Sequence, residues 1–176
     1  SEIKLAWSAG RIQSGCIGTH MLAIKNLTTE IGSEGGLIRA VDALSLTLAR
    51  GETFALVGES GCGKSMTALS ILRLLPDSGR VAGGEVNMEG TDLVQLPEAR
   101  MRDFRGRKIS IIFQEPSTSL NPVMTVGQQI AEVIERHTQT KGRAASDLAI
   151  DWLKRVGIPE PERRINDYPF QMSGGQ

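Results

Sequence analysis

The stretch GESGCGKS, residues 58–65, constrains the fold of this chain more than any other feature of its sequence. It fits the pattern G-x-x-x-x-G-K-[ST], in which a glycine-rich loop joins a strand to the start of a helix. TFALVG at 53–58 is a nearly unbroken apolar run, as expected of a strand covered on both faces of a parallel sheet. KSMTALSILRLL at 64–75 carries the apolar stripe of a helix. Together these segments predict an α/β protein.

The residue types in this loop suit the binding of phosphate. Glycines let the backbone curl and bring its N–H groups onto phosphate oxygens, and the start of a helix adds a positive dipole end. Lys64 would reach the β- and γ-phosphates, and the hydroxyl of Ser65 would ligate Mg²⁺. The sequence predicts a nucleotide site, against the alternative of a glycine-rich turn without a ligand. The nucleotide-binding residues expected here are Gly58, Glu59, Ser60, Gly61, Cys62, Gly63, Lys64, Ser65 and Met66.

Composition narrows the class of protein further. The 176 residues allow one domain or part of a larger one, and 40% apolar and 23% charged residues are ordinary for a soluble protein. No run reaches the roughly 18 apolar residues of a membrane span. A formal net charge of zero argues against nucleic acid as the main partner. Two cysteines, Cys16 and Cys62, are too few for a disulfide framework, which favours a reducing, cytoplasmic compartment. No second Cys or His is spaced to assist Cys62, so a redox or metal role is not expected for it.

The rest of the chain alternates in pattern between strands and helices. Strands are predicted at 22–29, 40–49, 83–90 and 108–113, and helices at 97–106, 126–136 and 144–156. Residues 30–36, EIGSEGG, have the composition of a loop. The helix at 126–136 is expected to bury Val126, Ile130, Val133 and Ile134 on one face.

Phosphoryl transfer also needs an acidic Mg²⁺ ligand at the end of a strand, and two stretches resemble one. LAID at 148–151 lies within a helical pattern, so Asp151 is expected to be a solvated helix residue. SIIFQE at 110–115 is apolar, but its first polar residue is Gln114, which ligates metal weakly or orients a water. The sequence contains no apolar strand followed by Asp-Glu.

Three motifs in order, GESGCGKS, IIFQEPSTSLNPVMTV and YPFQMSGGQ, closely resemble the nucleotide-binding subunit of ABC transporters. The middle stretch most resembles the subgroup that imports oligopeptides, dipeptides, nickel or glutathione. The resemblance covers residues 21–176 and implies a P-loop NTPase fold whose C-terminal part is missing. Residues 21–113 would be an antiparallel β subdomain with the Walker A part of a RecA-like core, and 114–176 the Q-loop and a helical subdomain. Residues 1–20 would be a tag or other non-native extension, or a genuine extension.

The resemblance also implies roles for residues. Gln114 matches the Q-loop glutamine, which contacts Mg²⁺ and the attacking water, so Gln114 and Lys64 would be catalytic. MSGGQ matches the signature motif, with Met172 in place of leucine. ATP and Mg²⁺ would be the cofactors. The signature residues expected to contact the ATP of a second subunit are Ser173, Gly174, Gly175 and Gln176.

Two features depart from the family pattern. Importers of this kind usually stack adenine on an aromatic residue upstream of Walker A, but residues 22–50 contain no Phe, Tyr or Trp. Gln114 is followed by Glu115 and Pro116 where the subgroup commonly has Asp-Pro. Because the catalytic glutamate of the family follows the signature, the chain by itself is expected to bind nucleotide weakly at best and not to turn it over.

The partners implied are a second ABC ATPase subunit, identical or a paralogue, and integral membrane permease subunits that contact the Q-loop and helical subdomain. A solute-binding protein would act indirectly. The location implied is the cytoplasmic face of the inner membrane, as a peripheral subunit. Two alternatives stay open, a soluble ABC-type ATPase acting on nucleic acid or ribosomes and a gene fragment without function. The basic run of Arg100, Arg102, Arg105, Arg107 and Lys108 is interpreted as a solvated helix face.

Overall fold

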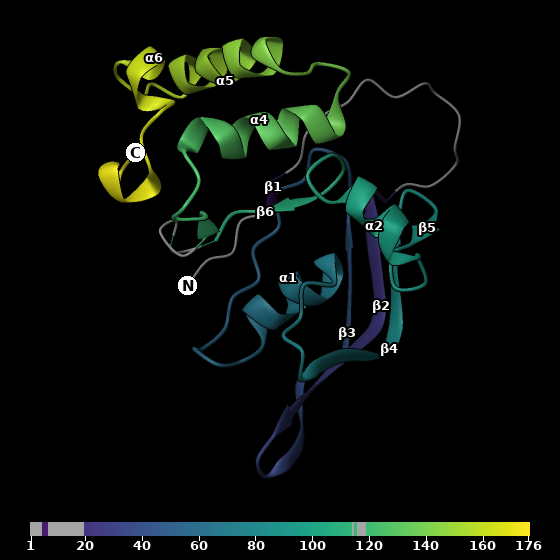
Figure 1. Ribbon diagram of the computed structural model, residues 1–176. Helices are drawn as coiled ribbons and strands as arrows, with labels where there is room; N and C mark the ends of the chain where they lie inside the picture. Colours follow the sequence, from purple (N-terminus) through teal and green to yellow (C-terminus); the bar gives the residue numbers. More distant parts are fainter. Residues whose placement is uncertain (1–4, 7–19, 114, 116–118) are drawn as a thin grey trace. The chain divides into compact units, whose positions relative to one another are not determined.

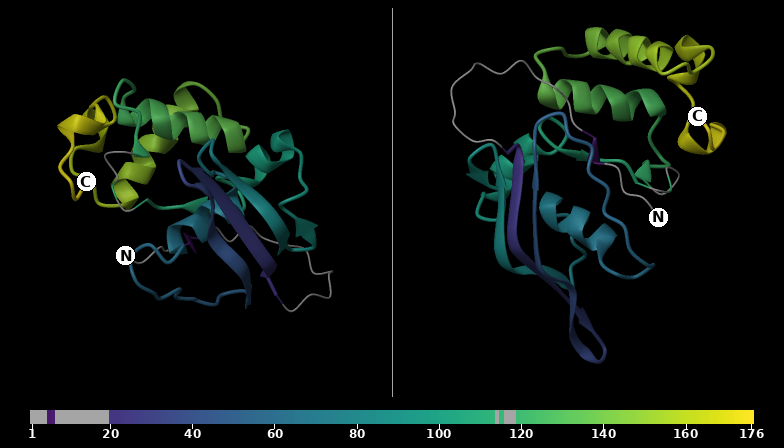
Figure 2. Two further views of the ribbon diagram at one scale, coloured as in Figure 1. Left: turned by 90° about the horizontal axis from the view of Figure 1, so that it is seen from below. Right: turned by 180° about the vertical axis from the view of Figure 1, so that it is seen from behind.

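The computed structural model describes residues 5–6, 20–113, 115 and 119–176. They form two compact units, one reaching to Ile112 and one beginning at Phe113 (Figures 1 and 2). The first unit holds the β-sheet and the glycine-rich loop, and the second is helical.

The sheet of the first unit is antiparallel. A long hairpin of β2 (Leu22–Ser33) and β3 (Gly36–Leu48) is extended by β4 (Gly79–Met88), which pairs with β2, and by β5 (Thr91–Asp92). The prediction of a loop at 30–36 is wrong. Both strands extend into this segment, and Ile31 pairs with Ile38. Backbone pairing satisfies the N–H and C=O groups there, so polar and glycine residues extend the hairpin instead of ending it.

Helix α1 (Lys64–Leu72) packs against this sheet, as Figure 1 shows. It ends three residues before the predicted end, because Arg73 adopts a left-handed conformation with φ 52° and its N–H bonds back to the last turn. The hydroxyl groups of Thr29 on β2 and Ser70 on α1 lie 2.7 Å apart, and both residues are fully buried. The residues of the core around them are Leu22, Ile24, Leu27, Val41, Ile71, Leu72, Val86, Met88, Leu93, Met101 and Ile109.

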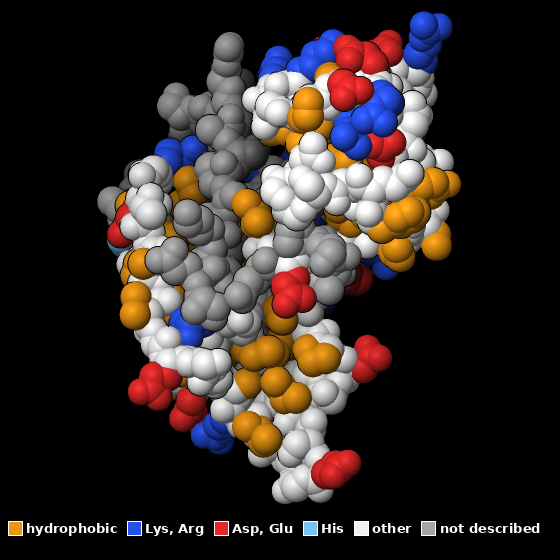
Figure 3. Space-filling model, turned by 90° about the vertical axis from the view of Figure 1, so that its left-hand side faces the viewer, with side chains coloured by type: hydrophobic (Ala, Val, Ile, Leu, Met, Phe, Trp, Pro, Cys, Tyr) orange, Lys and Arg blue, Asp and Glu red, His pale blue; other side chains and the backbone are white. Residues whose placement is uncertain are grey.

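The two continuous apolar runs do not form the strands predicted for them. Residues 52–59 have no regular secondary structure, and in the run at 108–113 only β6 (Ser110–Ile111) is a strand, paired with β1 (Leu5–Ala6). Val57 is 89% exposed and Ile112 is 64% exposed. A strand forms only where a neighbour takes up its backbone hydrogen bonds, and among the described residues none pairs with 52–59. Figure 3 shows hydrophobic side chains gathered on one face of the molecule.

Helix α2 (Glu98–Phe104) completes the first unit. The second unit contains α4 (Val126–His137), α5 (Arg143–Arg155), α6 (Pro161–Arg164) and the 3₁₀ turn η1 (Pro169–Gln171). Its core consists of Val126, Ile134, Ala145, Ala149, Leu153 and Ile165.

Helix α4 begins with a capping box, in which Thr125 and Gln128 satisfy each other's backbone N–H groups. The prediction that Val133 lies on the buried face of this helix is wrong, because Val133 is 52% exposed. Gly127 lies against Ile165, whose carbonyl oxygen accepts its N–H at 2.8 Å, and a Cβ at Gly127 would overlap the Ile165 side chain. The absence of a side chain at this position is therefore what allows α4 to approach the segment after α6.

Candidate functional site

The glycine-rich loop leads directly into α1. Gly61 and Gly63 have φ values of 87° and 91°, a region that residues with a side chain rarely adopt. Gly63 is also the N-cap of α1, and a Cβ there would overlap the carbonyl oxygen of Ala40 at the sheet. The loop can therefore follow this path only with glycine at these positions.

Lys64 lies at the centre of the loop and is only 8% exposed. Its Nζ donates hydrogen bonds to the carbonyl oxygens of Gly58 at 2.7 Å and Glu59 at 2.5 Å. A cation held by backbone carbonyls inside a loop of glycines is well placed to bind phosphate oxygens, because these can replace the carbonyls as acceptors. The loop thus concentrates one buried positive charge at the start of a helix.

The other loop residues surround this ammonium group. Glu59, Ser60, Cys62 and Ser65 are exposed, and Met66 is half-buried. The Sγ of Cys62, a free thiol, lies 3.4 Å from Lys64 Nζ, and a Cβ at Gly58 would lie 2.5 Å from that sulfur. Exposure of Ser65 leaves its hydroxyl accessible at the first turn of α1. The structure thus brings residues 58–66 together.

The signature residues belong to the second unit, where Ser173–Gln176 form an exposed turn. Gln176 N–H donates to the Ser173 carbonyl at 2.9 Å, and its side-chain oxygen accepts the Ser173 N–H at 3.0 Å. The second bond is half of a capping box, the arrangement that opens a helix. Gly174 and Gly175 are exposed within this turn. Gln114, the predicted catalytic glutamine, lies outside the described residues.

The segment before the signature is aromatic. Tyr168 and Phe170 stack with ring centroids 5.6 Å apart and planes 9° apart. Tyr168 is 39% exposed and Phe170 is 75% exposed. The Tyr168 N–H donates to the side-chain oxygen of Gln171 at 2.8 Å, and Met172 packs against the core of the second unit. This backbone is fixed while its rings face solvent.

The basic run is only partly the solvated face that its sequence predicts. Arg105 is 19% exposed on its side chain and donates to the carbonyl oxygens of Leu72 at 2.7 Å and Arg73 at 2.9 Å, which end α1. Glu98 pairs with Arg105 at 2.6 Å and lies within ion-pair distance of two further arginines, Arg73 and Arg102. Arg105 therefore caps the helix that begins at the glycine-rich loop. Arg105 follows the last residue of α2 and is extended, so no (i, i+3) or (i, i+4) spacing in the sequence signals this pair.

Asp151 lies exposed on α5, as its helical pattern predicts. Among the described residues no group of three or more His, Cys, Asp or Glu side chains could hold a metal ion. No helix in the described part of the chain is long and apolar enough to cross a membrane.

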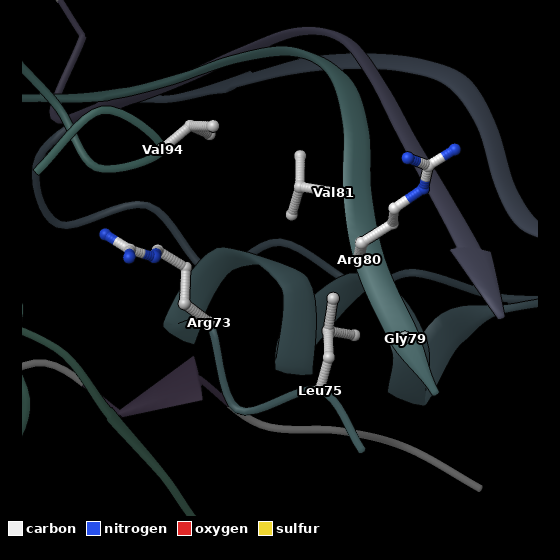
Figure 4. Close-up of a pocket in the computed structure, with 6 residues that line it drawn as sticks. All are labelled: Arg73, Leu75, Gly79, Arg80, Val81 and Val94. Atoms are coloured by element: carbon white, nitrogen blue, oxygen red, sulfur yellow. The ribbon is translucent and has the colours of Figure 1, made fainter. Parts of the chain in front are cut away.

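A pocket of about 310 Å³ lies in the first unit, away from the glycine-rich loop (Figure 4). The residues that line it are Arg73, Leu75, Gly79, Arg80, Val81 and Val94. Both guanidinium groups point away from its aliphatic walls, since Arg73 donates to the Leu96 and Leu93 carbonyls and Arg80 pairs with Glu30. The pocket therefore offers no uncommitted cation for a phosphate.

One family model covers both the glycine-rich loop and the turn at 173–176. The model of the ABC transporter family matches residues 41–176. The chain is 46% identical over 166 residues to "Probable peptide ABC transporter ATP-binding protein y4tR" of Sinorhizobium fredii, covering 94% of the chain and 50% of that protein. It is 45% identical over 158 residues to the oligopeptide transport ATP-binding protein OppD of Bacillus subtilis, covering 89% of the chain and 44% of OppD. The chain spans about half the length of the curated relatives it matches.

Solved structures agree with the fold. The dimeric structure of a bacterial ABC transporter cassette matches with a TM-score of 0.74 at 26% identity, over 89% of this chain and 65% of that one. A dimeric ATP-binding cassette in a post-hydrolysis state, bound to ADP and Pi, matches with a TM-score of 0.73 at 25% identity over the same shares. The predicted P-loop NTPase fold is thus confirmed, and the chain belongs to the ABC transporter family.

Proposed function

We propose that the protein is an ATP-binding subunit that couples ATP binding and hydrolysis to the import of peptides through a membrane ABC transporter. The observation that carries this proposal is Lys64, a buried ammonium group held by carbonyl oxygens inside a glycine-rich loop at the start of α1. The names of the relatives, which describe peptide and oligopeptide transport ATP-binding proteins, support peptides as the solute.

In this function the loop binds the nucleotide by exchange of partners. The β- and γ-phosphate oxygens replace the carbonyls of Gly58 and Glu59 around Lys64 Nζ, and backbone N–H groups of the loop bind the remaining oxygens. Mg²⁺ fits this site because the hydroxyl of Ser65 is accessible next to the phosphates. When bound, the ion neutralises charge on the phosphates. Gln114 is proposed to add its side-chain oxygen and to orient the attacking water.

The signature turn is proposed to act on the nucleotide of a second ATPase subunit. Ser173, Gly174 and Gly175 are exposed and offer a hydroxyl and backbone N–H groups to the γ-phosphate. The dimeric state of two structural relatives supports this arrangement. Closure of the dimer then completes the site, so nucleotide binding and subunit contact depend on each other.

Permease subunits are proposed to dock on the Q-loop and the start of α4, with the solute-binding protein acting through them. The segment before α4 is fixed, because the Gln129 side chain bonds the N–H and the carbonyl of Asn121 and the carbonyl of Met124. Val123, in the middle of this segment, is 79% exposed. A rigid loop with an exposed apolar side chain suits a protein interface. The subunit would then work as a peripheral protein at the cytoplasmic face of the inner membrane.

The decisive experiment uses Lys64→Ala in the full-length protein. ATP binding, followed by titration calorimetry, and ATP hydrolysis should both be lost. Lys25→Ala, at an exposed lysine of the same unit, is the matched control and should leave both unchanged. Undiminished ATP binding by Lys64→Ala would refute the proposed site. Peptide uptake by vesicles that hold the membrane subunits, dependent on Lys64, would separate a transporter from an ATPase that acts on nucleic acid.

A further inference from the structure

Among the described residues of the first unit, few aromatic side chains could stack on a nucleobase. From residue 8 to residue 53 the sequence contains no aromatic residue. Phe54 precedes the loop by four residues and is 43% exposed. The exposed side chains at the hairpin end, Leu37 and Ile38, are aliphatic and provide no π-face for stacking. The proposed phosphate site therefore lies in this unit, but the described residues beside it provide no evident stacking partner for the base.

The second unit presents an aromatic surface next to the signature turn. The Tyr168 and Phe170 rings are nearly parallel and offset, a favourable geometry for stacked rings. The Tyr168 ring stacks against one face of the Phe170 ring, and Phe170 is 75% exposed to solvent. Burial of the exposed face of Phe170 in a complex is favourable. Because the hydrogen bond between Tyr168 and Gln171 already fixes the backbone here, binding loses little conformational entropy.

We propose that the base of the nucleotide held by the glycine-rich loop of one subunit stacks on Phe170 of the second copy of this chain, with Tyr168 supporting the ring from behind. This inference rests on the proposed function. Phe170 lies three residues before Ser173, a distance of at most about 10 Å along the chain. One nucleoside triphosphate can span from a terminal phosphate at Ser173 to a base at Phe170.

The base would thereby be recognised by the subunit that contributes Phe170 and the signature turn, and not by the subunit whose loop holds the phosphates. Stacking on an aromatic face tolerates different bases, because every base has a π-face. The site would consequently select weakly between ATP and GTP.

The test compares Phe170→Ala with Phe170→Tyr in the full-length protein, with ATP and inorganic tripolyphosphate as ligands. Loss of one stacking partner should weaken ATP binding about tenfold, leave tripolyphosphate binding unchanged, and be rescued by tyrosine. Trp152→Ala, which removes a 48% exposed aromatic side chain from the same unit, is the matched control and should have no effect. Thermal unfolding checks that each variant is folded.

A mixture of two variants tests whether the base is bound by the second copy. A dimer of one Lys64→Ala subunit and one Phe170→Ala subunit contains one intact site only if the loop and the aromatic ring come from different subunits. In a 1:1 mixture that pairs at random, about half of the dimers are mixed and each holds one intact site, so about a quarter of all sites should regain ATP binding of wild-type affinity. Absence of rescue, as expected if Phe54 stacked the base within the same subunit, would overturn the inference.

Normal ATP affinity in Phe170→Ala would also overturn the inference that the base stacks on Phe170. If Lys64→Ala loses ATP binding in the same experiment, the proposed function still stands. Normal ATP binding in Lys64→Ala would instead refute the proposed function itself.

Discussion

The hydroxyl pair between β2 and α1 allows a quantitative test of how the sheet holds the helix that carries the loop. Ser70 donates to the carbonyl of Met66 at 2.5 Å, so its proton is committed, and Thr29 must donate to Ser70 at 2.7 Å. Thr29→Val removes this donor and leaves no buried donor unsatisfied. The expected loss is one net hydrogen bond, about 1 kcal/mol of the free energy of unfolding.

Ser70→Ala is expected to cost more, because it leaves the Thr29 hydroxyl without an acceptor at a position with no solvent exposure. An unsatisfied buried donor costs about 2 kcal/mol. In the double variant this hydroxyl is gone as well, so the loss should return to about 1 kcal/mol. The sum of the single losses, about 3 kcal/mol, exceeds this value by a coupling energy of about 2 kcal/mol.

Urea unfolding followed by far-UV circular dichroism measures all four proteins of this double-mutant cycle. Thr47→Val, at an exposed threonine of β3, is the control and should change stability by less than about 0.5 kcal/mol. If the losses of Thr29→Val and Ser70→Ala simply add in the double variant, the two hydroxyls do not depend on each other and the reasoning is wrong.

Three further predictions follow from single positions. Gly63→Ala should abolish ATP binding measured by titration, since φ of 91° and a close backbone carbonyl both oppose a side chain, and unchanged affinity would contradict this. Gly127→Ala should lower the free energy of unfolding by about 1–3 kcal/mol because its Cβ would overlap Ile165, and an unaltered melting temperature would argue against that contact. The hydrogen bond and charge of Arg105 hold the pKa of Glu98 below its ordinary value, so the stabilisation is present above pH 4.5 and is lost as pH falls through the folded-state pKa. Glu98→Gln should therefore remove part of the loss of melting temperature as pH falls below 4.5, and an unchanged pH profile would count against the pair.

Local chemistry makes the glycine-rich loop and the helices predictable. Gly61 and Gly63 adopt the backbone conformations that only glycine tolerates well, and the helix boundaries of α4 and α5 lie within one residue of those predicted. The end of α1 was less predictable, since Pro76 indicates a stop but Arg73 provides it earlier. A left-handed arginine carries no sequence signal, because its tertiary bonds to the Leu96 carbonyl and to Glu98 hold it there.

Strands and side-chain partners depend on distant residues, which a local pattern does not specify. The apolar run at 53–58 has the composition of a buried strand but no pairing neighbour among the described residues. Polar residues at 30–36 indicate a loop, but the hairpin register makes most of them strand. Arg105 looked like one of several exposed arginines, and only its contacts with the end of α1 distinguish it. Roles for Gln114 and the signature turn stay predictions.

The carboxylate of Glu98 is shared by three arginines, and this makes tolerance to mutation unequal within the cluster. Replacing any one arginine leaves the acid with two others. Replacing the acid leaves three neighbouring cations without their common counter-ion, including Arg105 at the end of α1. Among natural variants of this protein, neutral drift should therefore exchange the individual arginines more freely than Glu98. The one negative charge, and not the more numerous positive charges, is the part of this cluster that selection is expected to hold fixed.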